Sequence, residues 1–169
     1  CGSRVLVQQA LGHVYGAEVP QAEIDAVLAA YLGRYSADCT ALTGAMPGAD
    51  ALLHALAAEG VRLACVTNKP ERIAARVVGH VFPAIRFDVL LGGDSGAGTK
   101  PAPEPLRVVL TRCGVAVQDA LMIGDSRHDV HAARAAGVAV ICVANGYNHG
   151  EDVCDEHPDL VVQSLSELL

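Results

Sequence analysis

The stretch ALMIGDSRHDV, residues 120–130, joins two contrasting patterns at a single point. Residues 120–123 are continuously apolar, which is typical of a short buried strand, and the residues that follow indicate a helix that ends at Gly137. Gly124 and Asp125 lie where the strand gives way to the helix. This strand–turn–helix unit predicts an α/β fold.

The same alternation continues on both sides of this stretch, from Ala49 to the end of the chain. Helices are expected at 49–58, 70–79, 103–113, up to 136 and at the C-terminus, and strands at 61–66, 87–91, 120–123, 138–143 and around 160–162. Short, almost continuously apolar strands between helices predict a Rossmann-like parallel sheet covered by helices on both faces. In such a sheet the loops after the strands gather at one edge, and ligands bind there.

The first part of the chain has a different pattern. Apolar residues at helical spacing predict one helix around residues 5–14 and a second at about 21–35, and no strand pattern interrupts them. This change of pattern predicts two domains, a partial helical region at residues 1–45 and an α/β core at residues 46–169.

Composition and charge narrow the classes of partner. The chain has 169 residues, 51% of them apolar, so it has enough material for a buried core. It carries 12 basic and 19 acidic groups, a net charge of −7, and no basic stripe. Such a surface repels nucleic acid and anionic lipid. No apolar stretch reaches the roughly 18 residues needed to span a bilayer, and the N-terminus is not built like a signal peptide. We therefore expect a cytoplasmic protein without nucleic-acid or membrane partners.

The six cysteines are scattered and form no Cys-x-x-Cys pair, which argues against a disulfide framework and a zinc site. Cys65 and Cys142 lie inside apolar strand patterns, where a free thiol behaves as a small buried hydrophobe. The pairs with metal-ligand spacing are Cys154 with His157 and His128 with His131. A single pair is a weak signal, and solvated positions are the more common explanation.

The first strand end that carries chemical groups is Thr67-Asn68. A hydroxyl, an amide and the N–H groups of the helix that follows are suited to binding phosphate oxygens. A structural alternative exists, because Asn68 and Glu71 have the spacing of a helix capping box.

Lys100 follows the second strand and precedes Pro101. A residue before proline is held extended, so the backbone directs this side chain. Its ammonium could neutralise a phosphate or a carboxylate nucleophile, and the alternative is a solvated loop lysine. Residues 93–100 resemble a P-loop only superficially, because no hydroxyl residue follows the lysine to bind Mg²⁺.

Asp125 and Asp129 follow the strand at residues 120–123. Mg²⁺ prefers carboxylate oxygens and is usually held by one or two of them together with waters and substrate phosphate. Asp129 has a structural alternative, because Ser126 and Asp129 fit a capping box at a helix start. Asp125 has no such alternative and is the first candidate for a metal ligand.

Together these strand ends resemble the second, third and fourth motifs of the haloacid dehalogenase superfamily, and in particular its phosphoglycolate phosphatase branch. The matching segments are Val66–Pro70, Gly92–Asp94, Lys100–Pro103, Gly124–Asp129 and Gly146–Gly150. The opening helices are similar to the latter part of the small helical cap of that family, so the resemblance covers essentially the whole chain.

The resemblance implies a Mg²⁺-dependent phosphatase that acts on a small phosphorylated metabolite, with 2-phosphoglycolate the first candidate. Thr67 and Asn68 would bind the phosphoryl group, and Lys100 would bridge that group and the nucleophile. Asp125 would ligate Mg²⁺, and Asp129 would support the metal site or Lys100. A sugar-phosphate mutase or a pyrophosphatase of the same superfamily is the neighbouring alternative. Arg4 could meet a substrate carboxylate, although a surface position is more common.

The first motif of the family, Asp-x-Asp-Gly-Thr, does not occur here. None of the eleven aspartates stands in Asp-x-Asp spacing. In the family the first aspartate is the nucleophile and the second is the general acid and base. The resemblance places that motif on a central strand, between the strands that end at Val66 and Ile123. We interpret the sequence as an N-terminally truncated part of a longer enzyme, inactive by itself and less securely folded.

Two hypotheses outside catalysis follow from the lack of a nucleophile. The chain could bind a phosphate ligand or a protein partner without turnover. It could also complete its sheet with a second copy, and the sequence leaves the oligomeric state open.

Overall fold

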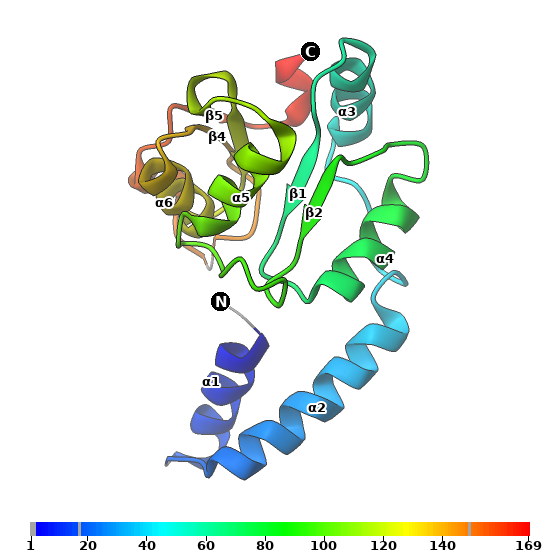
Figure 1. Cartoon of the computed structure of the whole chain (residues 1–169). Helices are drawn as coiled ribbons and strands as arrows, with labels where there is room; N and C mark the ends of the chain where they lie inside the picture. The colour runs from blue at the N-terminus through cyan, green and yellow to red at the C-terminus, as the bar shows by residue number, and fades with distance from the viewer. Residues whose placement is uncertain (1–2, 17, 149) are drawn as a thin grey trace.

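Parallel strands form two separate sheets in the computed structural model, which describes residues 3–16, 18–148 and 150–169. One sheet pairs β1 (Ala64–Val66) with β2 (Val89–Leu91). The other has the order β3 (Leu121–Gly124), β4 (Ala139–Val143), β5 (Leu160–Val162). Every pairing is parallel, which confirms the predicted class of fold (Figure 1).

Helices connect the strands in the predicted order. The α-helices are α1 (Ser3–Tyr15), α2 (Gln21–Asp38), α3 (Ala49–Ala58), α4 (Glu71–Val81), α5 (Glu104–Cys113) and α6 (Arg127–Ala136). Short 3₁₀ turns are η1 (Val117–Asp119), η2 (Val153–Glu156) and η3 (Leu165–Leu168). The expected C-terminal helix is thus the 3₁₀ turn η3, because four residues are too few to sustain an α-helix.

Strand β4 has buried side chains on both faces of its sheet. Its side chains alternate between the faces, as in any strand. Val140 and Cys142 belong to a core with residues of α5 and α6, whereas Val143 packs with α3, β5 and η3. Cys142 is fully buried in the first core, as expected for a small hydrophobe, and burial raises its pKa to about 12.

The strands of the first sheet are shorter than predicted. The apolar run at 61–66 predicts a strand of that length, but pairing with β2 begins only at Ala64. Just before that point the Asp88 N–H donates to the Leu63 carbonyl oxygen at 2.7 Å, but the Leu63 N–H donates to the Asp88 carboxylate at 3.0 Å, and the same carboxylate accepts an Arg62 hydrogen bond at 2.8 Å. A ladder needs a partner strand, and apolar character alone does not supply one.

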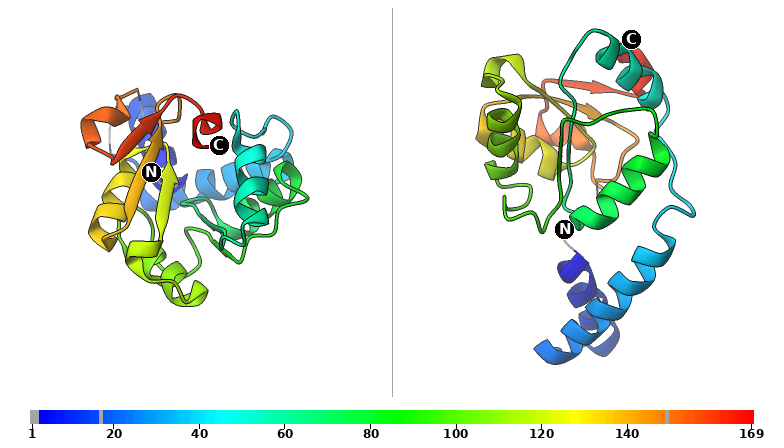
Figure 2. Two further views of the ribbon diagram at one scale, coloured as in Figure 1. Left: turned by 90° about the horizontal axis from the view of Figure 1, so that it is seen from above. Right: turned by 45° about the vertical axis from the view of Figure 1, so that its right-hand side comes forward.

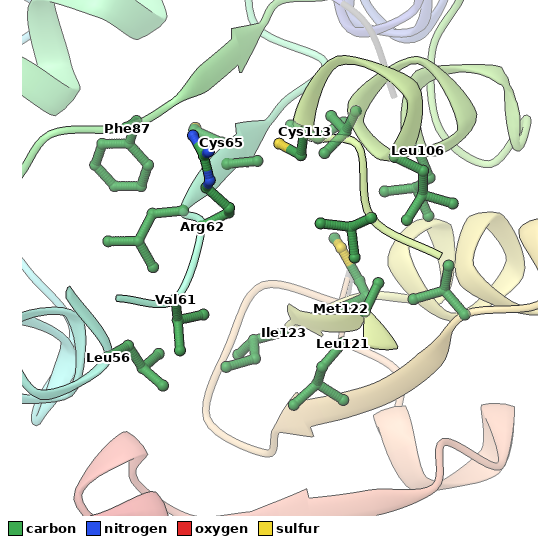
Figure 3. Close-up of a pocket in the computed structure, with 18 of the residues that line it drawn as sticks. Leu56, Val61, Arg62, Cys65, Phe87, Leu106, Cys113, Leu121, Met122 and Ile123 are labelled. Atoms are coloured by element: carbon green, nitrogen blue, oxygen red, sulfur yellow. The ribbon is translucent and has the colours of Figure 1, made fainter. Parts of the chain in front are cut away.

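Strands β1 and β3 do not pair with each other in the described part of the chain. Between them lies a cavity of about 840 Å³, here called the strand cleft, with β1 and Val61 on one side and β3 on the other. Figure 3 shows Val61 and Leu56 facing Ile123 across it. Leu121 and Val61 are 52% and 46% exposed, which is unusual for apolar residues at the centre of an α/β core.

Helices α1 and α2 pack on each other beyond the edge at which β1 and β2 end (Figures 1 and 2). The buried contacts include Val7 and Ile24, and Arg4 pairs with Asp25 at 2.7 Å. The predicted boundary at residues 45–46 falls between α2 and α3 and stays a prediction. Within the described ranges, none of the helices has the length and apolar character to cross a membrane.

Candidate functional site

Lys100 bridges the ends of β1 and β3. Its Nζ donates to the carbonyl oxygen of Val66 at 2.7 Å and to Asp129 Oδ1 at 2.6 Å. Both charged side chains are shielded, with 11% of the Lys100 side chain and 5% of the Asp129 side chain exposed. The ammonium therefore lies where the two sheets approach each other, and its geometry is fixed from both sides.

Asn68 fixes the backbone of Lys100. Its side-chain Nδ2 donates to the Lys100 carbonyl oxygen at 2.8 Å, and its Oδ1 accepts the Lys100 N–H at 2.9 Å. The amide of Asn68 is thus used to hold the loop after β2 against the end of β1. The expected contact between Asn68 and phosphate stays a prediction. Because the side-chain amide is bonded to Lys100, the backbone of Asn68 is better placed than its side chain to make that contact.

The structural alternative for Asn68, a capping box with Glu71, is wrong. No side chain caps α4 from the Asn68 position, because Asn68 is committed to Lys100. The Glu71 N–H donates instead to Asp94 Oδ1 at 2.7 Å, and Glu71 Oε2 accepts the Gly92 N–H at 3.3 Å. Asp94, more than 20 residues later in the sequence, therefore caps the start of α4 in place of Asn68.

Thr67 continues the pairing of β1, since its N–H donates to the Leu91 carbonyl oxygen at 3.0 Å. Its hydroxyl is half-buried and accepts the Lys69 N–H at 3.2 Å. The hydroxyl hydrogen can rotate toward a ligand, so Thr67 can act as a donor at the edge where Lys100 also lies.

Asp129 is held in its ionised form. Oδ2 accepts hydrogen bonds from the Asp125 N–H at 3.2 Å, the Ser126 N–H at 3.1 Å and the Ser126 hydroxyl at 2.8 Å, and Oδ1 pairs with Lys100. Burial alone would raise the pKa of Asp129, but the Lys100 charge and these hydrogen bonds outweigh it and lower the pKa. The capping box with Ser126 is present as well, so the structural and the electrostatic explanations both apply.

This pairing predicts a particular loss of stability in acid. The pKa of Asp129 is lower in the folded than in the unfolded state, where it is about 3.9. The ionised carboxylate therefore stabilises the fold above the unfolded pKa, and this contribution is lost as the pH falls through the folded pKa. Asp129→Asn should therefore flatten the fall in the free energy of unfolding between about pH 5 and pH 2, measured by urea titration. Asp155→Asn, at an exposed position on η2, should keep the original slope. An unchanged slope in Asp129→Asn would contradict the assignment.

Asp125 lines the strand cleft together with Lys100 and Asp129. Its Oδ2 accepts the Tyr147 N–H at 2.9 Å, and the side chain is half-buried. The oxygens of Asp129 are occupied by protein donors, so Asp125 is the better placed of the two to offer an oxygen to a cation. Among the residues that the structure describes, no group of three or more His, Cys, Asp and Glu side chains forms a complete metal site.

Two glycines allow the acidic side chains to lie where they do. A Cβ at Gly124 would overlap the Asp129 side chain, and one at Gly146 would overlap the Asp125 side chain. Gly146→Ala should therefore displace Asp125 and cost about 1–3 kcal/mol in the free energy of unfolding, measured by urea denaturation. The matched control is Gly79→Ala on α4, where nothing lies within 4 Å and alanine should stabilise the helix. Equal effects of the two substitutions would count against a tight fit at Gly146.

One buried polar residue near the site lies in the matching segment Gly146–Gly150 but has no role predicted from the sequence. Asn148 is 5% exposed, and its Oδ1 accepts the Arg127 N–H at the start of α6 at 2.9 Å. The side chain also donates to the Glu151 carbonyl oxygen at 3.2 Å. An asparagine in a glycine-flanked segment is typical of a turn, but the sequence does not indicate that its partner is the start of α6. His149 of the same segment lies outside the described residues.

Comparisons with known proteins agree with this arrangement. The model of the haloacid dehalogenase-like hydrolase family matches residues 7–143. Phosphoglycolate phosphatase 1 of Pseudomonas aeruginosa is 41% identical over 169 residues, covering 99% of this chain and 62% of that protein. A phosphoglycolate phosphatase of Pseudomonas putida is 39% identical with the same coverage. The chain thus spans less than two thirds of the length of these relatives.

Solved structures share the fold. A predicted phosphoglycolate phosphatase from Haemophilus somnus has a TM-score of 0.90 and 28% identity, covering 99% of this chain and 76% of that one. CbbY from Rhodobacter sphaeroides, solved in complex with phosphate, has a TM-score of 0.74 and 26% identity, covering 90% of this chain and 67% of that one. The resemblance identified from the strand-end motifs is confirmed at the level of family and fold.

Proposed function

Because the chain belongs to the haloacid dehalogenase-like hydrolase family, we propose that it carries the phosphate- and metal-binding part of a phosphatase site. The substrate class is a small phosphorylated metabolite, and 2-phosphoglycolate is the first candidate because relatives at about 40% identity bear the name phosphoglycolate phosphatase. The observation that carries the proposal is the buried Lys100 ammonium, held between the ends of β1 and β3 next to Thr67.

Each side chain has a role that its contacts support. The Thr67 hydroxyl would donate to a phosphoryl oxygen, and the Lys100 ammonium would balance the negative charge on the same group. Asp129 would keep Lys100 charged and oriented. It would not bind the phosphoryl group or the metal directly, because both Asp129 oxygens already accept hydrogen bonds from the protein. Asn68 would hold the Lys100 backbone in place. Preorganised charges of this kind cost little reorganisation during reaction.

Asp125 would hold Mg²⁺, in agreement with the ordinary chemistry of that ion. Mg²⁺ is commonly bound by one or two carboxylates with the remaining ligands supplied by water and phosphate, and Asp125 provides one such carboxylate in the cavity that Lys100 also lines. Bound there, the ion would neutralise phosphate charge. The residues of this chain therefore fit part of a magnesium site.

Turnover requires a nucleophile that the 169 residues do not contain, since no Asp-x-Asp pair occurs among them. We expect the strand that carries this nucleophile to lie in the strand cleft. A parallel strand between β1 and β3 would pair with both free edges and cover the exposed Leu121 and Val61. Its carboxyl end would lie at the edge that Lys100 occupies, so an aspartate there would face the phosphate.

A strand-extended protein tests this proposal. It consists of the chain preceded by an apolar strand segment that ends in Asp-x-Asp-Gly-Thr. With Mg²⁺ and 2-phosphoglycolate, it should release phosphate, whereas the 169-residue chain and a control extension that ends in Asn-x-Asn-Gly-Thr should not. A folded strand-extended protein that releases no phosphate from any small phosphomonoester would reject the phosphatase assignment.

The absence of an Asp-x-Asp pair also favours a second candidate function, phosphate binding without turnover. This candidate predicts that the strand-extended protein binds phosphate but hydrolyses nothing. Light scattering of the 169-residue chain addresses the related possibility that a second copy completes the sheet.

Substrates with two phosphates are a further alternative within the family, since CbbY was also solved in complex with xylulose-1,5-bisphosphate.

A further inference from the structure

Lys69 lies at the end of β1, two residues after Thr67. It follows Asn68 directly after β1, and its backbone is fixed on both sides. The Lys69 N–H donates to the Thr67 hydroxyl at 3.2 Å, and its carbonyl oxygen accepts the Gly93 N–H at 2.8 Å. The Lys69 side chain is exposed.

The ammonium of Lys69 is held by an aromatic ring instead of a carboxylate. Its Nζ lies 5.8 Å from the centroid of the Tyr35 ring on α2, and Tyr35 stacks on Tyr31 with 5.8 Å between ring centroids. A cation over an aromatic ring is attracted to it but keeps its full charge. Because α2 lies beyond the edge where β1 ends, this contact holds the ammonium between the helical region and the strand end (Figure 2).

Lys69 takes part in none of the ion pairs among the described residues. This is notable in a chain with a net charge of −7, in which acidic partners are abundant. The other candidate for a substrate carboxylate, Arg4, is already paired with Asp25 at 2.7 Å. Lys69 is therefore an unneutralised cation close to Thr67, whereas Arg4 has its counter-charge within the protein.

We propose that Lys69 binds a second anionic group on the substrate, a carboxylate, while Thr67 and Lys100 bind its phosphate. Tyr35 would orient the ammonium before the ligand arrives. The inference rests on the proposed function and narrows its substrate class to small phosphorylated acids, in which a carboxylate lies a few bonds from the phosphate ester. Lys69 would act as a specificity residue and would not take part in bond cleavage.

The test compares two ligands that differ in the carboxylate. Titration calorimetry with the 169-residue chain and Mg²⁺ would measure the affinity for 2-phosphoglycolate, for 2-hydroxyethyl phosphate and for inorganic phosphate. A charge-assisted contact predicts that 2-phosphoglycolate binds at least about tenfold more tightly than 2-hydroxyethyl phosphate. Lys69→Gln should reduce this preference to about twofold or less, Lys69→Arg should retain most of it, and neither should alter the affinity for inorganic phosphate.

Three outcomes would overturn the proposal. Two of them leave the phosphatase assignment intact: no preference for the carboxylate in the original chain, or an unchanged preference in Lys69→Gln. The third, no binding of inorganic phosphate at all, would remove the phosphate site itself and the proposed function with it. A Tyr35→Leu variant adds an independent readout, because a weaker preference with unchanged phosphate affinity is expected if the ring orients the ammonium.

Discussion

Asp125→Ala in the strand-extended protein is expected to lower kcat/KM for 2-phosphoglycolate by at least about 10²–10³-fold. Asp125 is the carboxylate at the site edge that pairs with no lysine among the described residues, since Lys100 pairs with Asp129 and Asp125 Oδ2 accepts the Tyr147 N–H at 2.9 Å. Its loss would remove the proposed Mg²⁺ ligand and leave the phosphate charge less well balanced. Steady-state phosphate release measured across a range of Mg²⁺ concentrations would report both the rate and the metal requirement.

The matched control for that experiment is Asp155→Ala, which removes an exposed carboxylate on η2. It should keep kcat/KM within a factor of about two, because surface substitutions away from a site change little. Asp125→Asn separates the charge from the shape of the side chain and should resemble Asp125→Ala. Full activity in either Asp125 variant would show that the metal assignment is wrong.

Lys100→Met is expected to destabilise the 169-residue chain by about 3–5 kcal/mol, because it leaves the buried Asp129 carboxylate without its cation. The substitution also removes the hydrogen bond to the Val66 carbonyl oxygen, which links the loop after β2 to the end of β1. Urea denaturation followed by far-UV circular dichroism would measure the change in the free energy of unfolding.

Lys69 provides the matched control for stability, since it is the other lysine of the chain and its side chain is exposed. Lys69→Met should change the free energy of unfolding by less than about 1 kcal/mol. The double variant Lys100→Met/Asp129→Leu should recover part of the stability lost in Lys100→Met, because it removes the unpaired charge as well. A loss below 1 kcal/mol in Lys100→Met would contradict a tightly coupled pair.

The order of the elements and the position of the site edge could be predicted from the sequence because both depend on local patterns. The apolar run at 120–123 and the Gly124-Asp125 turn after it indicate a strand and a helix start from neighbouring residues alone, and the structure has both. Once the sheet is known to be parallel, its carboxyl edge collects the strand ends by geometry alone. The class of fold and the neighbourhood of Lys100 and Asp129 follow from these two steps.

The remaining features depend on contacts between distant residues. The spacing of Asn68 and Glu71 indicates a local cap, but the Asn68 amide bonds to Lys100, more than 30 residues later. The cap of α4 comes from Asp94 and the support of α6 from Asn148 for the same reason. The contact of Lys69 with Tyr35 joins the helical region to the strand end, and no periodicity in the sequence indicates it.

Isothermal titration of the 169-residue chain with inorganic phosphate, with and without Mg²⁺, tests the central claim most directly. If Thr67, Lys100 and Asp125 form one site, Mg²⁺ should tighten phosphate binding by at least about fivefold, and phosphate should tighten Mg²⁺ binding by the same factor. Asp125→Ala should abolish this coupling while phosphate still binds. Phosphate affinity that is independent of Mg²⁺, or coupling that survives in Asp125→Ala, would contradict a shared site at this edge of the sheet.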